Sequence, residues 1–515
     1  MKEIEKFISL RDEFSKALEP AAINTEETCW DFYTNSTEEN AKMYEKAQDE
    51  YSKLFQDKNM YEKFMEIDSS KLPKHEAKQL KDLIREFDEE LNTGEALKEL
   101  RKRENEIAKK LNSYVPKIDG REVTKTEITK ILQTETNPEI RKKAHLAKID
   151  GGRLIAEDLI EFVKMRNEYA KTKKFNSYFD YKLEETYDVK ADFLNELIKE
   201  VYSKAKLKIK DIQERKYSEL KEFFGTNKLE PYHYGLLLDS NPEKGVNEIL
   251  ANQNVEEISK KTYLGMGYDV DEMVKSGKLT LDLYPRKGKN THGFCFGVEA
   301  GKDSRILANL TNNIISLDTL NHEMGHCVYD LGISTDLPFL DKQPASPAFT
   351  EAIAMMTGDI MKRENILADI VPKDLLIRFK DSHKEDEAMF VSRSLLIIDF
   401  EREFYNNTNQ NPDKLWRDLK VKYLNRNEEP DAEWATIPHY LSHPAYYQNY
   451  FRATIMKAQI YNHLKNVLGN ITENKDTAEY MRKNIFSLGA SVDEYDLIKQ
   501  LTGKEFSAND FAESL

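Results

Sequence analysis

The chain has 515 residues, and its 77 basic and 92 acidic side chains give a formal net charge of −15. Nucleic acid is therefore not expected as a partner, because clustered positive charge drives that kind of binding. With only 20 Gly and 15 Pro, the sequence lacks the many turns that an all-β fold needs. No stretch approaches the roughly 18 apolar residues of a membrane-spanning helix, so no membrane partner is expected either.

Three cysteines, Cys29, Cys295 and Cys327, are too few for a disulfide framework in so long a chain. The first residues, Met-Lys-Glu-Ile-Glu-Lys-Phe-Ile, lack the apolar centre of a signal peptide. We therefore expect a cytoplasmic protein. The sequence does not predict an oligomeric state.

Residues 1–275 have the pattern of successive helices, in which Glu and Lys are mixed with apolar residues at spacings of three and four. Leu194, Leu197 and Val201, for example, fall on one side of such a helix. No linker rich in Pro, Gly or Ser interrupts the chain. We expect a mainly α fold in which residues 1–515 form a single catalytic domain with two helical lobes around a deep channel.

The pattern changes near residue 277. Residues 279–284 and 291–298 alternate between apolar and polar side chains, and Pro285–Gly288 forms a turn between them. This predicts two short strands around a turn. A further turn is expected at Gly301–Asp303, and helices resume after Ser316.

The next helix contains the sequence His322-Glu323-Met-Gly-His326. We expect Ser316 to cap it and Gly332 to end it. Two histidines four residues apart lie on the same side of a helix, so they can hold one metal ion. Glu323 beside them is placed to take a proton from a metal-bound water, which is the HExxH pattern of zinc peptidases.

A catalytic zinc ion keeps three protein ligands and one open position, so the motif needs a third ligand. Glu351 is the candidate, on a second helix that Ser346 caps and Pro347 begins. Its neighbours are apolar, and a carboxylate in such a setting is costly unless it is paired or bound to metal. The predicted metal ligands are His322, His326 and Glu351.

A third segment, residues 436–451, is rich in tyrosine and leads into a long helix expected to start at Ser442 and end near Gly469. Tyr446 and Tyr450 are one helical turn apart. In isolation, an aromatic stripe in the core is the simpler interpretation, because aromatic residues usually pack. Two histidines in the same segment also allow a site rich in hydrogen-bond donors, which could stabilise an oxyanion next to zinc.

Several motifs together resemble the angiotensin-converting-enzyme family of zinc peptidases. They are the HExxH core with Glu351-Ala-Ile, a preceding His292, Gly301-Lys-Asp-Ser-Arg-Ile306, Trp30–Asn40, and His439 followed by Tyr447-Gln-Asn-Tyr450-Phe451. Another stretch, Asp282–Lys289 with His292-Gly-Phe-Cys-Phe296, resembles the related thimet oligopeptidase family. The chain therefore resembles two branches of one superfamily.

The resemblance implies a set of catalytic roles. His322, His326 and Glu351 bind Zn²⁺, and Glu323 acts first as general base and then as general acid. Tyr450 donates a hydrogen bond to the oxyanion.

His439 is expected to assist Tyr450, and His443 is a rival for that role. Tyr447 is expected to contact the substrate. A strand edge at His292, Gly293 and Cys295 would hold the substrate backbone by strand addition.

The chain also departs from the converting-enzyme pattern. Ile437 stands where dipeptide-releasing members carry a Lys for the substrate carboxylate, and Asn449 stands in place of a chloride-linked Arg. Met355 replaces an Asp that orients a zinc histidine, so the partners of these histidines are not identified.

We expect a zinc metallopeptidase that acts on short peptides, with endo cleavage favoured because of Ile437. Carboxy-dipeptidase activity is the alternative within enzymes. A helical peptide-binding protein with an inactive zinc site is the alternative outside them, and the intact Glu323 argues against it.

Overall fold

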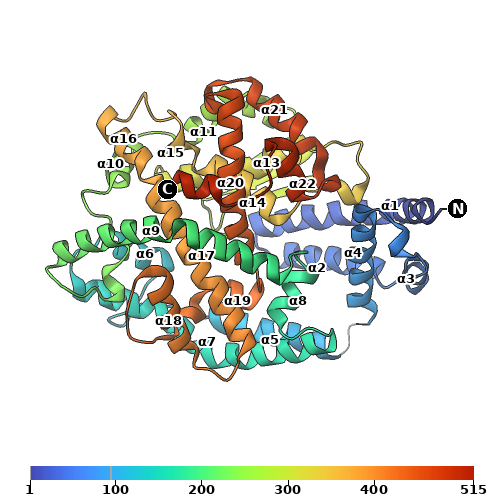
Figure 1. The fold of residues 1–515 in the computed structure, drawn as a ribbon, viewed down its shortest axis with the longest axis horizontal. Helices are drawn as coiled ribbons and strands as arrows, with labels where there is room; N and C mark the ends of the chain where they lie inside the picture. Colours follow the sequence, from blue (N-terminus) through green and yellow to red (C-terminus); the bar gives the residue numbers. More distant parts are fainter. Residues whose placement is uncertain (1, 93–94) are drawn as a thin grey trace. The chain divides into compact units, whose positions relative to one another are not determined.

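Helices make up most of the chain, as the ribbon in Figure 1 shows. The structure is a computed structural model, and it describes residues 2–92 and 95–515. Within these residues the strands form only two small sheets, one of two strands and one of three. The predicted mainly α fold is confirmed.

The chain forms two compact units, each assembled from separate stretches of sequence. Unit 1 comprises Met1–Thr93, Val246–Lys380 and Met456–Phe506, and unit 2 comprises Gly94–Gly245, Asp381–Ile455 and Ser507–Leu515. The chain changes unit within three helices, α10 (Pro242–Leu250), α16 (Lys373–Asp381) and α20 (Tyr447–Leu468). The expectation of a single domain over residues 1–515, with a deep channel, stays a prediction.

Unit 1 contains long helices at the N-terminus and the predicted HExxH helix. Its helices are α1 (Glu3–Thr34), α2 (Glu38–Leu54), α3 (Lys58–Met65), α4 (Lys74–Leu91), α11 (Val255–Met266), α12 (Val270–Lys275), α13 (Ile314–Gly332), α14 (Pro347–Gly358), α15 (Ile360–Arg363), α16 (Lys373–Asp381), α21 (Asp476–Asn484) and α22 (Glu494–Thr502). A cluster of buried phenylalanines, which includes Phe14, Phe55 and Phe87, holds α1–α4 together.

The three-stranded sheet of unit 1 consists of β3 (Leu279–Asp282), β4 (Phe294–Glu299) and β5 (Asp303–Leu307), in the order β3-β5-β4. The first two strands lie where the sequence predicts them, but they do not pair with each other. Both pair with β5, which the sequence analysis missed: β3 runs parallel to it and β4 antiparallel. The turn predicted at Gly301–Asp303 joins β4 to β5, and β4 is left at a sheet edge.

Two sequence motifs fix this sheet. Trp30 and Tyr33 of α1 pack edge-on against Phe296 of β4. Their ring centroids lie 5.5 Å and 5.8 Å, respectively, from that of Phe296. In the stretch that resembles thimet oligopeptidases, the buried Lys289 ammonium donates hydrogen bonds to the carbonyl oxygens of Asp282, Tyr284 and Ala308. These motifs therefore position the edge strand.

Unit 2 is built from helices α5 (Glu95–Asn112), α6 (Lys125–Thr134), α7 (Pro138–Thr172), α8 (Tyr178–Glu185), α9 (Ala191–Phe224), α17 (His383–Asn406), α18 (Pro412–Leu424), α19 (His439–Ser442) and α23 (Asn509–Ser514), with a hairpin of β1 (Lys117–Ile118) and β2 (Arg121–Glu122). Arg166 of α7 is fully buried and donates hydrogen bonds to the carbonyl oxygens of Tyr440 and Leu441. A buried guanidinium thus ties α7 to the tyrosine-rich segment.

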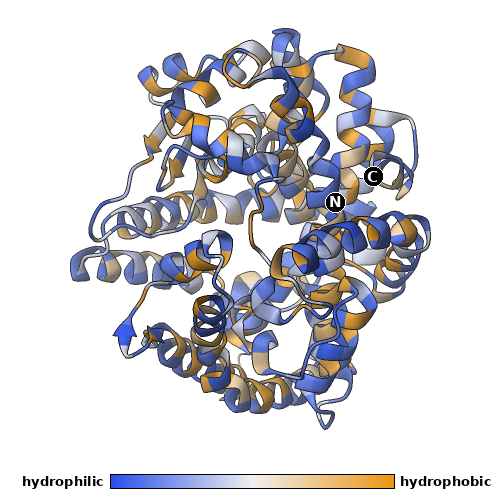
Figure 2. Ribbon diagram, turned by 90° about the vertical axis from the view of Figure 1, so that its left-hand side faces the viewer, coloured by the Kyte–Doolittle hydropathy of each residue, from blue (hydrophilic) through white to orange (hydrophobic). Residues whose placement is uncertain are grey.

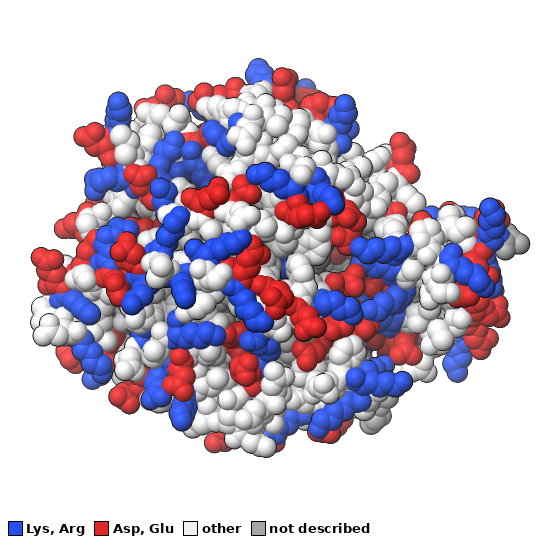
Figure 3. All heavy atoms as spheres, in the orientation of Figure 1, with Lys and Arg blue, Asp and Glu red and all other residues white. Residues whose placement is uncertain are grey.

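The helices carry hydrophilic and hydrophobic residues side by side, as Figure 2 shows. Within the described part of the chain, no helix combines the length and the apolarity that crossing a membrane requires. On the face shown in Figure 3, basic and acidic side chains are interspersed.

Candidate active site

The HExxH helix is α13, and its start differs from the prediction. The Asn313 side chain is the N-cap and accepts a hydrogen bond from the Ser316 backbone, 2.8 Å away. Ser316 lies inside the helix, where its hydroxyl accepts from the Thr311 backbone at 2.9 Å. The helix ends at Gly332 as predicted.

The helix of the third predicted ligand is α14. Ser346 caps it by accepting from the Phe349 backbone at 3.0 Å, and Pro347 is its first residue, both as predicted. The helix packs closely on α13 at Gly325, inside the HExxH motif. A Cβ on Gly325 would lie 2.9 Å from the Ala354 Cα, so only glycine permits this approach.

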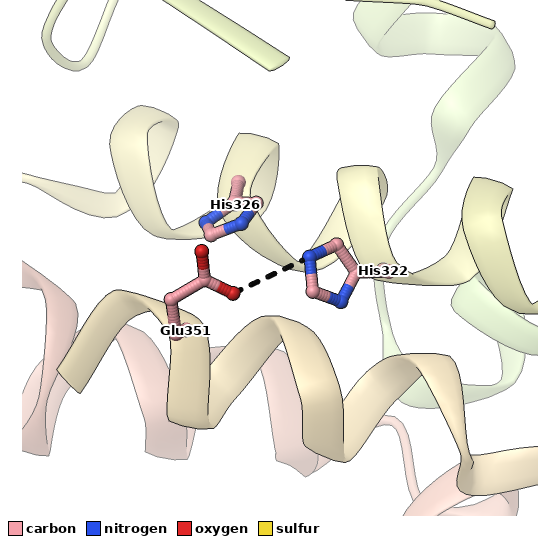
Figure 4. Close-up of side chains that lie close together, drawn as sticks. All are labelled: His322, His326 and Glu351. Atoms are coloured by element: carbon pink, nitrogen blue, oxygen red, sulfur yellow. Dashed lines mark ion pairs between the residues drawn. The ribbon is translucent and has the colours of Figure 1, made fainter. Parts of the chain in front are cut away.

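His322, His326 and Glu351 come together between these two helices, as Figure 4 shows. One ligand atom from each lies within 4.8 Å of the others, and His322 Nε2 is 3.6 Å from Glu351 Oε2. Burial and the positive charge of Lys457 lower the pKa of His322 to about 4, and burial also lowers that of His326. Two neutral imidazoles and one carboxylate are the donor set that a catalytic zinc ion takes, so these residues fit that metal.

Glu323 follows His322 on α13, and its side chain is buried. Burial and the negative charge of Glu351 raise the pKa of Glu323 to about 8. The backbone N–H of Cys295 in β4 donates to its carboxylate. A Cβ on Gly293 would lie 3.2 Å from Glu323 Oε1 and 2.8 Å from the Thr319 methyl, so glycine leaves room for the acid.

The sequence analysis missed Thr350. Its hydroxyl lies 2.8 Å from His326 Nδ1, on the residue directly before Glu351. This contact fixes the imidazole so that Nε2 faces the carboxylate. The only signal for it in the sequence is its position beside Glu351 on the same helix.

In unit 2 the tyrosine-rich segment is not one helix from Ser442. It consists of α19, an irregular stretch and α20, which ends at Leu468 before Gly469. Ala445 in this stretch has a positive φ of +61°, which no helix allows, and its N–H donates to the buried Glu401 carboxylate at 3.0 Å. The helix start was mispredicted because a long-range hydrogen bond determines it.

His439 packs against both tyrosines of the predicted site, with ring centroids 4.8 Å from Tyr447 and 6.0 Å from Tyr450. Burial lowers its pKa to about 4, so the neutral ring keeps one N–H donor. His443 is exposed, contacts Tyr446, and its Nδ1 lies 2.8 Å from the Ser442 hydroxyl. This packing favours His439 over His443 as the partner of Tyr450.

The predicted site residues thus form two groups, one in each unit. The metal ligands, Glu323 and the segment His292–Cys295 belong to unit 1, and His439, Tyr447 and Tyr450 belong to unit 2. The roles assigned to these residues stay predictions.

A mainly α fold in which a helix presents two histidines and a buried glutamate, and a second helix adds a carboxylate, is the arrangement typical of metallopeptidases of the HExxH class. The model of the family described as Peptidase family M3 matches residues 131–515, and the chain belongs to that family. This confirms the resemblance on the thimet oligopeptidase side, whereas that to the converting-enzyme family stays a prediction.

A curated relative is Oligopeptidase PepF of Bacillus subtilis (strain 168). The two chains are 25% identical over 370 residues, which cover 66% of this chain and 52% of the relative. The chain thus spans about half the length of the curated relative that it matches.

Proposed function

We propose that this protein is a zinc-dependent peptidase that hydrolyses short peptides in the cytoplasm. The observation that carries the proposal is the convergence of His322, His326 and Glu351 beside the buried Glu323. Zinc, when bound, would polarise the scissile carbonyl and lower the pKa of a water molecule.

Glu323 is the general base in this proposal. Its carboxylate takes a proton from the attacking water and returns it to the leaving nitrogen. Burial strengthens the base, since it raises the pKa of Glu323, and the Cys295 N–H holds the carboxylate in one orientation. We therefore assign the Cys295 backbone to the positioning of Glu323, and propose that His292 and Gly293 bind the substrate.

Tyr450 is proposed to donate its hydroxyl proton in a hydrogen bond to the oxyanion, with His439 as a second donor. The packing of the neutral His439 ring against Tyr450 supports this pairing. Tyr447, on the other side of His439, is proposed to contact the substrate.

Endo cleavage is the favoured mode. The relative PepF is named an oligopeptidase, and Ile437 occupies the position of the Lys that binds a terminal carboxylate in dipeptide-releasing enzymes. The carboxy-dipeptidase mode and an inactive peptide-binding protein are the alternatives.

The test is a metal-removal experiment on the full chain. The purified protein should contain close to one zinc per chain, lose peptidase activity on chelation and regain it when zinc is added back. Mass spectrometry of the products from a peptide library, with free and blocked C-termini, separates endo from dipeptidyl cleavage. Full activity in protein shown to be metal-free would disprove the zinc mechanism.

A further inference from the structure

One face of α17 packs along the segment that contains His439 and Tyr450. The Phe390 ring lies edge-on to Tyr450, with centroids 6.4 Å apart. Seven residues on, the Ile397 carbonyl accepts from the Tyr440 hydroxyl at 3.1 Å. Because helical neighbours recur every three or four residues, Arg393 lies on this same face, between these two contacts.

Arg393 is exposed, and it forms no ion pair or side-chain hydrogen bond with any other described residue. This is unlike Arg402, farther along α17, which pairs with Asp399 at 2.7 Å. The positive charge of the Arg393 guanidinium nevertheless affects Tyr447 in the segment that contains His439 and Tyr450. Burial raises the pKa of Tyr447, and the charge of Arg393 opposes that rise.

A second cation, Lys148 of α7, acts with Arg393. The Lys148 ammonium makes no hydrogen bond and no ion pair with another residue among residues 2–92 and 95–515. Desolvation by the surrounding residues lowers the pKa of Lys148, and the Glu433 carboxylate opposes this shift. The positive charge of Arg393 lowers the pKa of Lys148 further. Two cations that repel each other raise the local positive potential, which an anion bound beside them relieves.

We propose that Arg393, assisted by Lys148, binds a carboxylate of the peptide substrate. A guanidinium suits this task because its planar N–H groups match a carboxylate bidentately. The chain as a whole has a net charge of −15, so an acidic peptide needs such a local positive site to bind. The carboxylate is either the C-terminus of the peptide or an acidic side chain, and the proposal rests on the peptidase function proposed above.

The test uses one parent peptide in four forms, with Glu or Gln at an internal position and with a free or amidated C-terminus. We expect the zinc-loaded wild type to favour at least one carboxylate form over its neutral counterpart by about 10- to 100-fold in kcat/KM. Arg393→Gln should bring that ratio close to one while cleavage of the neutral peptide is preserved. Arg393→Lys should keep part of the preference, and Lys148→Gln should reduce it less.

Lys384→Gln is the matched control, because Lys384 is an exposed cation in the first turn of the same helix. It should leave every ratio unchanged. The carboxylate that loses its advantage in Arg393→Gln identifies the source: loss of the preference for the free over the amidated C-terminus points to the C-terminus, and loss of the preference for Glu over Gln points to a side chain. An unchanged ratio in Arg393→Gln overturns the proposal, as does an equal loss on charged and neutral peptides.

Equilibrium binding of the same peptides in a Glu323→Gln background separates this proposal from the peptidase function. If the wild type cleaves no peptide, the proposed function fails, but a carboxylate preference in binding that Arg393→Gln removes still supports the carboxylate site. Absence of binding, or binding without such a preference, overturns the carboxylate site.

Discussion

The two groups of site residues are built in different ways. In unit 1, His322 and His326 are held by the regular spacing of α13, and Glu351 is held by the capped helix α14. In unit 2, His439 and Tyr450 are separated by an irregular stretch in which Ala445 has a positive φ. Helical periodicity and the close packing of two capped helices at Gly325 determine the first arrangement, whereas the second depends on contacts with buried side chains far away in the sequence.

Those distant contacts come from two buried side chains. Arg166 of α7 donates to the backbone of Tyr440 and Leu441, and Glu401 of α17 accepts from the backbone of Ala445. A polar or charged group buried in this way is costly unless its hydrogen bonds are made, so these two side chains strongly constrain the segment. A site held by local periodicity can therefore be predicted from sequence, whereas a site held by buried groups distant in sequence cannot.

The largest effect on catalysis is expected at Glu323, beside the predicted metal ligands of unit 1. Glu323→Gln should lower kcat by on the order of 10²–10⁴, because the amide cannot accept the proton. Zinc content and melting temperature should stay at the wild-type values, since the metal ligands are untouched. Steady-state kinetics and metal analysis on one preparation check this, with Glu257→Gln at an exposed position of α11 as the control. Wild-type turnover in the Glu323 variant would show that the base is another group.

The next prediction tests whether Tyr450 in unit 2 takes part in catalysis or only packs in an aromatic core. Tyr450→Phe keeps the ring and removes the hydroxyl, so an oxyanion donor predicts a loss in kcat of about 10²–10³. KM and melting temperature should not change, because the hydrogen bond belongs to the transition state. Tyr446→Phe, one turn earlier, is the control and should be nearly silent. A Tyr450 variant with normal kcat would assign the residue to the aromatic core.

Much of unit 1 could be predicted from sequence because its signals are local. The cap at Ser346 and the end of α13 at Gly332 followed from residue type, and the position of His322 and His326 on one side of α13 followed from a spacing of four. Their role as metal ligands stays a prediction. The pairing of β3 and β4 through β5 could not be predicted, because the alternating pattern identifies strands but not their partners. The start of α20 was mispredicted for a similar reason, because Glu401, which accepts a hydrogen bond from Ala445 just before this helix, is distant in sequence.

Thr350 tests how the predicted metal ligand His326 is held in unit 1. Thr350→Val keeps the shape but removes the acceptor for His326 Nδ1, so zinc affinity should fall by about 10- to 100-fold. Thr350→Ser should restore most of that affinity because it keeps the hydroxyl. Competition with a chelator of known affinity measures this without reference to activity. Unchanged zinc affinity in the valine variant would show that the contact does not orient the ligand.

The last prediction concerns Glu401, the residue that shapes the group in unit 2. Burial raises the pKa of Glu401 to about 8, whereas a glutamate in the unfolded chain titrates near 4.3. Between these values folding takes up a proton, so Glu401 makes the wild type lose stability as pH rises, by up to about 1.4 kcal/mol per pH unit. Below about pH 4 both states are protonated, and above about pH 8 both are ionised, so the contribution is then constant.

Glu401→Gln removes this titration and keeps an oxygen that can accept from the Ala445 N–H. Thermal unfolding across pH 5 to 8 should therefore show that the variant becomes more stable relative to the wild type as pH rises. At pH 5 the two stabilities should differ little. Glu403→Gln, at an exposed position two residues on, should follow the wild type throughout. A constant difference between Glu401→Gln and wild type would mean that the carboxyl is ionised in the folded protein. In that case an ionised carboxylate, and not a neutral acid, would hold Ala445 in its left-handed conformation.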